Sequence, residues 1–449
     1  MRAKDIIKAT ITGLDSELRG TFVLEEHTVS VGGACVGDHV EVEISSVSRH
    51  HARAFAHLRN ALRRSEEFVW PPCPQAAPLR GQCGGCGAMH LSASVQDQAR
   101  RAHVQALLAE LGVENVAWIA APEHLGYRNR SNYVVAKGRG ESVVLGSYAP
   151  RGREVASMAG CLIVRPAISR VEASMRAVLE RYEVTCEAQP QALRWVTLRA
   201  SARGEVVVEL VVRSAGAHWL EAIAADLMAI DGVQGIAVSV NDEATNAIRV
   251  GESHTLAGQT TLFERVGRVE LEIPAGAFAQ LNTDVASQMY MRAAELVSAN
   301  AVVWDLYAGL GGLGLNVAAA DKGTRVFGAD SVATSIEAAE RSAERHDLDA
   351  HFVVADLSQD LPANWPQPGA IIVNPPRRGL DEVVLKCLET SAATQLIYMS
   401  CGPASFARDA SRLFDAGWRL DVIEAYDMLP QTPHVELLAR FCRPSGREI

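Results

Sequence analysis

The chain has 449 residues, with 43 lysines and arginines against 53 aspartates and glutamates, and a formal net charge of −10. Its length predicts roughly two to four domains. Its content of 48% hydrophobic and 21% charged residues excludes a disordered or fibrous chain. The acidic balance disfavours a generic binder of nucleic acid or anionic membranes.

The beginning of the chain and its hydropathy indicate where the protein resides. No run of about 18 apolar residues occurs, so the sequence predicts no transmembrane helix. The first residues, MRAKDIIKATITG, contain no apolar core of a signal peptide. We therefore expect a cytoplasmic protein, in which the nine cysteines do not form a disulfide framework.

Residues 6–45 predict a small β unit, because β-branched segments alternate there with glycines. The next segment, 48–64, contains five arginines and three histidines but no acidic residue. It is typical of a solvated helix face or linker, and equally of a surface that faces phosphates. Between 46 and 135, ten arginines stand against six acidic residues, so the net negative charge belongs to the rest of the chain.

A cysteine-rich loop follows, and a helical pattern near 93–112 comes after it. Cys73, Cys83 and Cys86 lie within fourteen residues, and Cys161 lies apart. In a reducing compartment such thiols indicate a metal site. Four thiolates would satisfy an iron–sulfur cluster or a zinc ion equally well. From 125 to about 275, β-rich runs alternate with two helical stretches.

After about residue 275, strand-like and helical segments alternate regularly, which indicates βαβ units and a parallel sheet. The expected strands are VVWDLYAG (302–309), RVFGAD (325–330), HFVVAD (351–356), GAIIVNPP (369–376) and TQLIYMSC (394–401). Ligands bind such sheets where strands end and helices begin.

The first of these strand ends predicts a nucleoside cofactor. Gly309, Gly311 and Gly312 allow the backbone to approach a ligand closely, and Asp330 at the end of the next strand can bind a ribose diol. Asp356, one strand further, suits the adenine edge. Because the turn lacks a pyrophosphate-binding glycine pattern and a Walker lysine, S-adenosylmethionine fits better than NAD or ATP. An NAD-dependent oxidoreductase is therefore disfavoured.

The last strand ends predict the chemistry. Cys401 follows the fifth strand, and Glu436 enters a later one. A thiolate and a base suit methylation at carbon 5 of a pyrimidine, because that carbon becomes nucleophilic only after a thiolate adds to carbon 6. Asn374 begins Asn-Pro-Pro-Arg, and Arg377 replaces the aromatic residue that would favour methylation of an amine. We therefore predict Cys401 as nucleophile and Glu436 as base.

Five segments of the C-terminal third, taken together, resemble the RNA 5-methyluridine methyltransferase family of the TrmA, RlmC and RlmD type. They are FAQLN (278–282), WDLYAGLGGLGL (304–315), VNPPRRGL (373–380), IYMSCGPASFARD (397–409) and DMLPQTPHVELL (427–438). Asn374, where TrmA and RlmD have Asp, resembles the RlmC type most closely. Ala308 departs from the cysteine that the family usually has.

The resemblance implies an α/β architecture of three domains. Residues 1–60 resemble a TRAM domain, an OB-like RNA-binding β-barrel. Residues 61–270 would form a central α+β domain with the cysteine-rich metal loop and an RNA-binding surface. Residues 271–449 would form a Rossmann-like class I methyltransferase domain. For the cysteines, the resemblance favours a [4Fe–4S] cluster over zinc, although the gap between Cys73 and Cys83 is longer than usual.

The resemblance also implies the site and the activity. Gln280, Tyr307, Gly312, Asp330 and Asn374 would line the pocket for cofactor and uracil. The predicted activity is S-adenosylmethionine-dependent methylation of carbon 5 of a uridine in 23S rRNA, with the target base flipped out of the RNA. The alternatives are a tRNA uridine or an RNA cytosine target, and a non-catalytic iron–sulfur RNA-binding protein. We expect a monomer that requires neither a membrane nor a protein partner.

Overall fold

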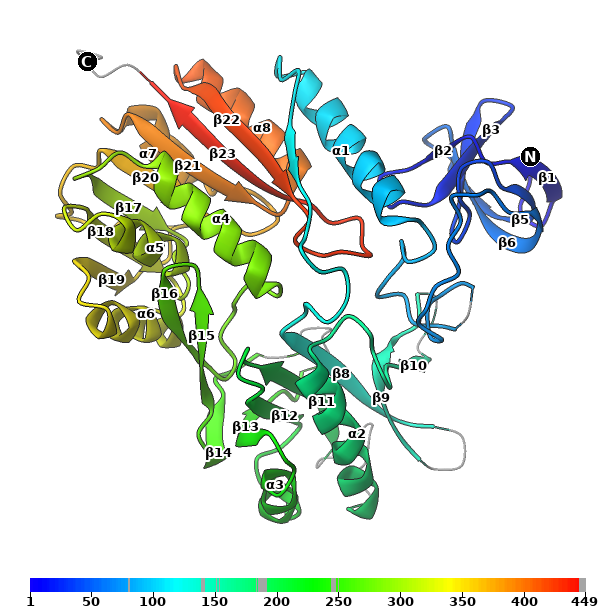
Figure 1. The fold of residues 1–449 in the computed structure, drawn as a ribbon, viewed down its shortest axis with the longest axis horizontal. Helices are drawn as coiled ribbons and strands as arrows, with labels where there is room; N and C mark the ends of the chain where they lie inside the picture. Colours follow the sequence, from blue (N-terminus) through cyan, green and yellow to red (C-terminus); the bar gives the residue numbers. More distant parts are fainter. Residues whose placement is uncertain are drawn as a thin grey trace.

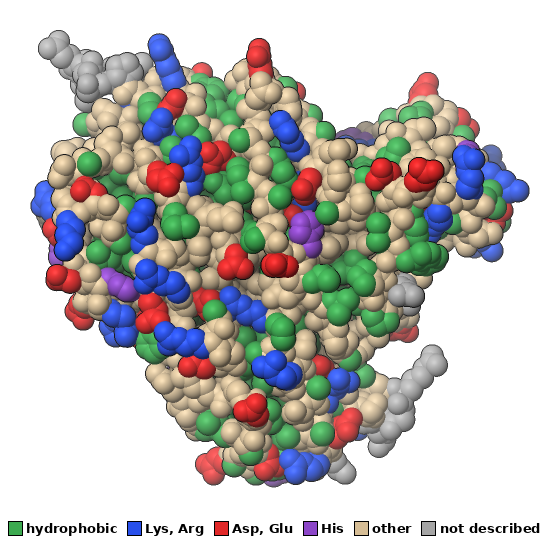
Figure 2. All heavy atoms as spheres, in the orientation of Figure 1, with side chains coloured by type: hydrophobic (Ala, Val, Ile, Leu, Met, Phe, Trp, Pro, Cys, Tyr) green, Lys and Arg blue, Asp and Glu red, His purple; other side chains and the backbone are tan. Residues whose placement is uncertain are grey.

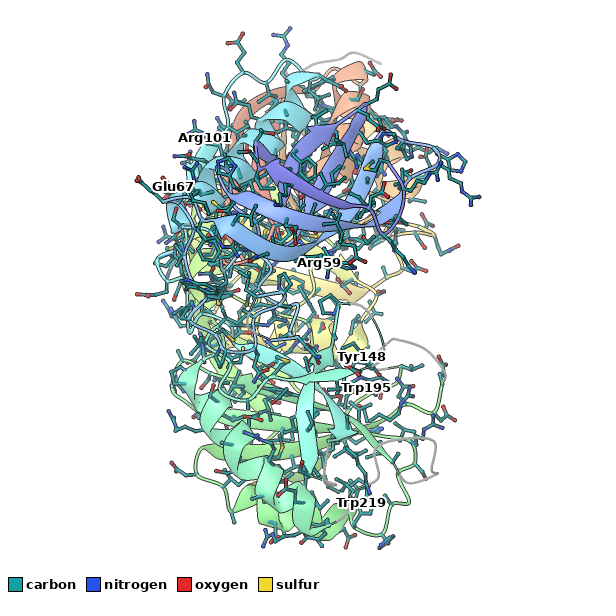
Figure 3. The ribbon with its side chains drawn as sticks, turned by 90° about the vertical axis from the view of Figure 1, so that its right-hand side faces the viewer. Arg59, Glu67, Arg101, Tyr148, Trp195 and Trp219 are labelled. Carbon is teal, nitrogen blue, oxygen red and sulfur yellow. The ribbon has the colours of Figure 1, made fainter. Side chains whose placement is uncertain are left out.

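The computed structural model describes residues 1–79, 81–138, 142–150, 152, 154–182, 184, 192–243, 248 and 250–443. Figure 1 shows a six-stranded N-terminal sheet, a seven-stranded central sheet and an eight-stranded C-terminal sheet, with a two-stranded hairpin between the last two. In the view of Figure 3, the N-terminal sheet lies in front of the C-terminal part, and the central sheet lies below both. No helix in the described part of the chain is long and apolar enough to cross a membrane.

The N-terminal sheet has the strand order β1-β5-β6-β4-β3-β2. Its strands are β1 (Ile6–Thr10), β2 (Gly13–Leu14), β3 (Gly20–Leu24), β4 (His27–Val31), β5 (His39–Val47) and β6 (Arg53–Arg63). Alternate residues, such as Val40, Val42 and Ile44, form a small apolar core. The prediction of a helix face or linker at 48–64 is wrong, because most of that segment forms β6 between β5 and β4.

The predicted helix near 93–112 is confirmed as α1 (Ala93–Ala109). Ser92 caps it, since its side chain accepts a hydrogen bond from the backbone nitrogen of Val95. The chain then forms β7 (Ala117–Ile119), which pairs in parallel with a strand of the C-terminal sheet. Thus α1 and β7 become part of the C-terminal body before the central sheet begins.

The central sheet has the order β10-β9-β8-β11-β12-β13-β14. Its strands are β8 (Arg130–Lys137), β9 (Val143–Tyr148), β10 (Val155–Ser157), β11 (Leu193–Ala200), β12 (Val206–Val212), β13 (Val233–Val240) and β14 (His254–Gly258). The two predicted helical stretches are α2 (Pro166–Arg181) and α3 (Leu220–Met228). They pack against one apolar face of the sheet, which includes Val196, Leu198 and Val208.

The C-terminal sheet has the order β19-β18-β17-β20-β21-β23-β22-β7. Its remaining strands are β17 (Val302–Leu306), β18 (Arg325–Asp330), β19 (Ala350–Val354), β20 (Ala370–Val373), β21 (Gln395–Ser400), β22 (Arg419–Tyr426) and β23 (Glu436–Cys442). The five predicted strands are confirmed as β17–β21, and they are mutually parallel. Strand β23 runs antiparallel to β21.

Helices cover both faces of this sheet, which gives a Rossmann-like three-layer arrangement. One apolar layer contains residues of α4 (Thr283–Leu296), α5 (Gly312–Ala320) and α6 (Ala333–Arg345). The other contains residues of α1, α7 (Glu382–Thr390) and α8 (Pro403–Asp415). The hairpin of β15 (Thr261–Val266) and β16 (Val269–Pro274) joins the central sheet to α4. On the face shown in Figure 2, acidic and basic side chains are interspersed.

Candidate functional site

A cavity of about 730 Å³ opens at the carboxyl ends of the parallel strands. This is the edge of an open α/β sheet where ligands bind. The structure brings nine of the ten residues predicted for catalysis and cofactor binding to this cavity. They are Gln280, Tyr307, Gly309, Gly312, Asp330, Asp356, Asn374, Cys401 and Glu436. The tenth, Gly311, does not line it.

The turn between β17 and α5 explains the glycines. Gly309 and Gly311 both adopt positive φ angles, of 54° and 72°, which glycine reaches at little cost. A Cβ atom on Gly309 would meet nothing within 4 Å, whereas one on Gly311 would lie 2.8 Å from the Phe352 ring. Gly309 therefore leaves its backbone open to a ligand. Gly311 has a packing role, which is why it lies outside the cavity.

The two predicted acidic residues lie at neighbouring strand ends. The Asp330 carboxylate accepts hydrogen bonds from the backbone nitrogens of Gly309 and Val332, both at 3.0 Å. Asp356 accepts from the backbone and hydroxyl of Ser358, and these bonds lower its pKa. Both carboxylates are thus held in place at the cavity wall, Asp330 directly beside the glycine turn.

Cys401 and Glu436 come together although they belong to different strands. Cys401 follows β21, and Glu436 is the first residue of the adjacent strand β23. Burial raises the pKa of the Cys401 thiol, and the nearby Glu436 raises it further. Burial also raises the pKa of Glu436, which is only 5% exposed, to about 8. A carboxyl group with such a pKa can accept a proton near neutral pH.

Arg377 faces both of these groups, and the sequence reasoning did not assign it a role. Its guanidinium lies near both groups: it lowers the pKa of the Cys401 thiol and opposes the rise in the pKa of Glu436. Arg377 therefore favours the charged forms of nucleophile and base together. Its position in the VNPPRRG motif was a signal that it belongs to the site.

Two aromatic residues of the cavity also went unassigned. Phe278 is 61% exposed, although it is a large apolar side chain. Tyr290, from α4, is buried, and a Cβ atom on Gly312 would lie 2.7 Å from its ring. An exposed aromatic ring at the edge of a cavity can stack on a flat ligand. Phe278 lies within the FAQLN motif, which pointed to this segment.

The loop that leads to Glu436 is held by residues far away in the sequence. Tyr127 donates a hydrogen bond of 3.0 Å to the carbonyl oxygen of Pro430. The Gln96 side chain exchanges two hydrogen bonds with Gln431, and the Ala88 backbone nitrogen donates to the Gln431 carbonyl oxygen. These contacts fix the backbone between the end of β22 and the predicted base.

The four predicted metal ligands lie in one neighbourhood, next to this loop. Cys73, Cys86 and Cys161 pack against a small apolar cluster that also contacts Leu429. Burial raises the pKa of Cys86 and the neighbouring Cys161, Cys83 and Cys73 add to the rise, to about 12, so all four thiols interact. Among the described residues, however, no three His, Cys, Asp or Glu side chains are arranged as a metal-binding group. The structure thus supports the proximity of the four thiols, and the metal site stays a prediction.

Two protein-family models match the part of the chain that carries this site. The family described as "Methyltransferase small domain" matches residues 268–397, and the family described as "tRNA (Uracil-5-)-methyltransferase" matches residues 358–440. The second match contains Asn374, Arg377, Cys401 and Glu436.

Similar proteins extend over nearly the whole chain. An "Uncharacterized RNA methyltransferase" of Clostridium tetani is 28% identical over 444 residues, covering 95% of this chain and 94% of that protein. One of Staphylococcus aureus is 27% identical over 455 residues, with 97% and 98% covered.

A solved structure establishes the fold. It is the Pyrococcus abyssi tRNA (uracil-54, C5)-methyltransferase in complex with S-adenosyl-L-homocysteine, at 24% identity and a TM-score of 0.76, covering 97% of this chain and all of that one. Relatives and family models together indicate an RNA (uracil-5-)-methyltransferase. The resemblance to RNA 5-methyluridine methyltransferases that the motifs indicate is therefore confirmed, and the C-terminal part of the chain matches the two family models. The RlmC-type subtype and the TRAM domain stay predictions.

Proposed function

We propose that this protein methylates carbon 5 of a specific uridine in 23S rRNA, using S-adenosylmethionine. The observation that carries the proposal is the meeting of Cys401, Glu436 and Arg377 in the cavity that also contains the glycine turn. A non-catalytic RNA-binding protein would have no use for a half-buried nucleophile and a buried base at the ends of adjacent strands.

The residues of the chain divide the reaction between them. The Cys401 thiolate, stabilised by Arg377, adds to carbon 6 of the uracil and makes carbon 5 nucleophilic. S-adenosylmethionine supplies the methyl group that carbon 5 takes. Glu436 then removes the proton from carbon 5, and the bond between sulfur and carbon 6 breaks, which frees Cys401.

The cofactor would occupy the part of the cavity formed by the ends of β17, β18 and β19. Gly309 offers an open backbone there, and Asp330 lies beside it to bind the ribose. Asp356 would lie at the adenine. Gln280 and Asn374, which line the same cavity as Cys401, would hold the uracil through their amide groups.

We also propose domains at 1–60, 61–270 and 271–449, with α1 and β7 of the middle segment packed into the C-terminal body. The N-terminal sheet, proposed to be the OB-like TRAM domain, contains the arginine-rich strand β6. Arg53, Arg59 and Arg63 have exposed side chains there. We propose that they contact RNA phosphates, while the acidic remainder of the chain limits non-specific binding.

We further propose that Cys73, Cys83, Cys86 and Cys161 hold a [4Fe–4S] cluster, with zinc as the alternative. The support is the convergence of four thiols, whose thiolate forms a bound metal would stabilise. Such a site would stabilise the loop that packs against Leu429 and Gln431. It would have a structural role in the arrangement of the catalytic base.

A tRNA uridine is the alternative substrate, and the description of the matched family favours it. Labelled S-adenosylmethionine, incubated with the protein and either deproteinised rRNA or total tRNA, distinguishes the two. We expect label in 5-methyluridine of 23S rRNA, identified by nuclease digestion and mass spectrometry. Label in tRNA alone would show that tRNA is the substrate instead of 23S rRNA. Label on an exocyclic amine would refute the mechanism.

A further inference from the structure

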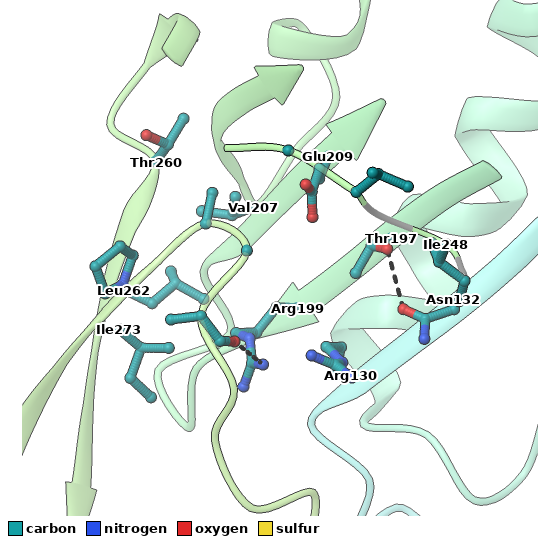
Figure 4. A pocket seen from close by; sticks show the side chains of 16 residues that line it. Arg130, Asn132, Thr197, Arg199, Val207, Glu209, Ile248, Thr260, Leu262 and Ile273 are labelled. Carbon is teal, nitrogen blue, oxygen red and sulfur yellow. Dashed lines mark hydrogen bonds between the residues drawn. The ribbon is translucent and has the colours of Figure 1, made fainter. Parts of the chain in front are cut away.

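A second cavity, of about 360 Å³, lies directly beside the first. The two share Ile273, Gly276 and Ala277, so the segment that leads to Phe278 and Gln280 forms the wall between them. The floor of the second cavity is the face of the central sheet opposite to α2 and α3 (Figure 4).

The floor is a polar grid set by strand register. Asn132 of β8 lies opposite Thr197 of β11, and Thr197 lies opposite Glu209 of β12. Two residues further along, Arg130 lies opposite Arg199. Figure 4 shows these side chains on the same side of the sheet, with the two arginines at one end and Glu209 at the other. Thr197 donates a hydrogen bond of 3.0 Å to Asn132.

Two charged side chains of this grid are buried, which is unusual for charged groups. Arg199 is 6% exposed and Glu209 is 3% exposed. Arg130, Arg199 and Glu209 all have partners within the chain, and all three line the second cavity. A structural face would be apolar, as the opposite face of the same strands is, with Leu198 and Val208. The polar face therefore points to a ligand.

The grid is also held in position. Arg199 donates a hydrogen bond of 3.0 Å to the carbonyl oxygen of Ala277, in the wall between the two cavities. The Glu209 carboxylate accepts hydrogen bonds from the hydroxyls of Ser239 and Ser253. On the opposite side, Leu262 and Ile273 of the hairpin provide an apolar surface.

We propose that this second cavity binds the nucleotide that adjoins the target uridine in the RNA strand. A guanidinium pair suits a phosphate, the apolar surface suits the face of a base, and a carboxylate suits an exocyclic amino group. Because a single phosphate joins neighbouring nucleotides, a uracil at Cys401 would bring the next nucleotide to the shared wall. The inference rests on the proposed function, and it adds a preference for a base with an amino group at one flanking position.

The test uses synthetic RNA hairpins whose loops present one uridine with adenosine on both sides. In two further hairpins, one adenosine at a time is replaced by purine riboside, which lacks only the amino group. Binding to the full-length protein is measured by fluorescence anisotropy. We expect about tenfold weaker binding for the replacement at one of the two positions. Equal binding of all three hairpins to the wild-type protein would overturn the proposal.

Glu209→Gln completes a thermodynamic cycle. This variant keeps one acceptor oxygen but loses the charge, so it should discriminate less between the adenosine and purine riboside hairpins. Glu209→Met, which has no oxygen to accept from the amino group, should bind both equally. Discrimination that persists in Glu209→Met would show that the base is read elsewhere. Arg130→Gln should weaken the binding of all three hairpins by the same factor. Arg181→Gln, an exposed arginine on α2 beneath the other face, serves as the matched control and should change nothing.

Methyl transfer to the same hairpins is measured in parallel, so that the two proposals fail separately. Discrimination without any 5-methyluridine would contradict the proposed function and leave the nucleotide-binding cavity in place. Formation of 5-methyluridine without discrimination between the hairpins would overturn only the proposal that the second cavity binds the adjoining nucleotide. Melting temperatures of the variants, compared with the wild type, show that each is folded.

Discussion

Arg100 of α1 and Asp427, just beyond β22, form a buried ion pair with two nitrogen–oxygen distances of 2.5 and 2.8 Å. One of the same two guanidinium nitrogens also donates to Asp97 at 2.7 Å, and the carbonyl oxygen of Thr432 accepts from Arg100 at 3.4 Å. The pair therefore connects the helix after the cysteine loop to the segment that ends at Glu436.

Replacing Arg100 should damage both stability and catalysis. Arg100→Met leaves the Asp427 carboxylate buried without its cation, and such a loss costs about 3–5 kcal/mol. We expect a lower melting temperature by calorimetry and a lower kcat, because the segment before Glu436 loses its anchor. Arg101→Met, an exposed neighbour on the same helix, is the control. Unchanged stability in the Arg100 variant would contradict the structural role.

Removing the nucleophile should separate chemistry from binding. Cys401→Ala is expected to abolish methyl transfer to RNA while titration calorimetry still detects S-adenosylmethionine binding. The reason is that only the addition to carbon 6 requires the thiol. Cys387→Ala, a half-buried cysteine on α7, should retain activity. Residual transfer by Cys401→Ala at a rate comparable to wild type would exclude the covalent mechanism.

Removing the base should trap the intermediate. Glu436→Gln retains shape and polarity but cannot take the proton from carbon 5. Addition and methylation should still occur, and a covalent adduct of protein and RNA should accumulate. Denaturing gel electrophoresis detects it as a species of reduced mobility. Turnover at the wild-type rate, without any adduct, would assign the base to another residue.

The pKa of Glu436 predicts how the rate depends on pH. Burial raises that pKa to about 8, and Cys401 is raised in the same direction. Because both groups act deprotonated, the single-turnover rate should rise as Glu436 loses its proton near pH 8. It should continue to rise above pH 8, because the pKa of the Cys401 thiol is raised above its ordinary value. Glu436→Gln should lose the inflection that belongs to the base. A rate that falls between pH 6 and 8 would contradict this assignment.

The same shift has a consequence for stability. A carboxyl group whose pKa is higher in the folded than in the unfolded chain favours folding when protonated. Its contribution is therefore lost as the pH rises from about 4.5 towards 8. Urea unfolding at several pH values should show this loss in the wild type and a weaker one in Glu436→Gln.

The four cysteines can be tested by metal analysis. Protein purified without oxygen should be brown and contain about four iron atoms per chain. Cys83→Ser should lower the iron content and the melting temperature, whereas Cys35→Ser, outside this group, should retain the iron. Colourless wild-type protein with one zinc per chain would favour zinc instead.

The sequence by itself determined the position of most of the site along the chain. Gly309, Asp330 and Cys401 each follow a recognisable strand, and parallel strands end at one edge of their sheet, so these residues had to meet. The motifs added Gln280, Asn374 and Glu436, and all of these line the same cavity. Gly311 was the exception, because packing against Phe352 rather than ligand access explains it.

Only the tertiary structure decided what these residues face. The ion pair of Arg100 and Asp427 joins positions 327 residues apart, and no local pattern indicates such a pair. Segment 48–64 became a strand because neighbouring strands complete its hydrogen bonds, although its composition also suited a helix. The polar grid beneath the second cavity depends on the register of three strands. Local sequence determines the period of a strand, but pairing between distant strands determines which side chains meet.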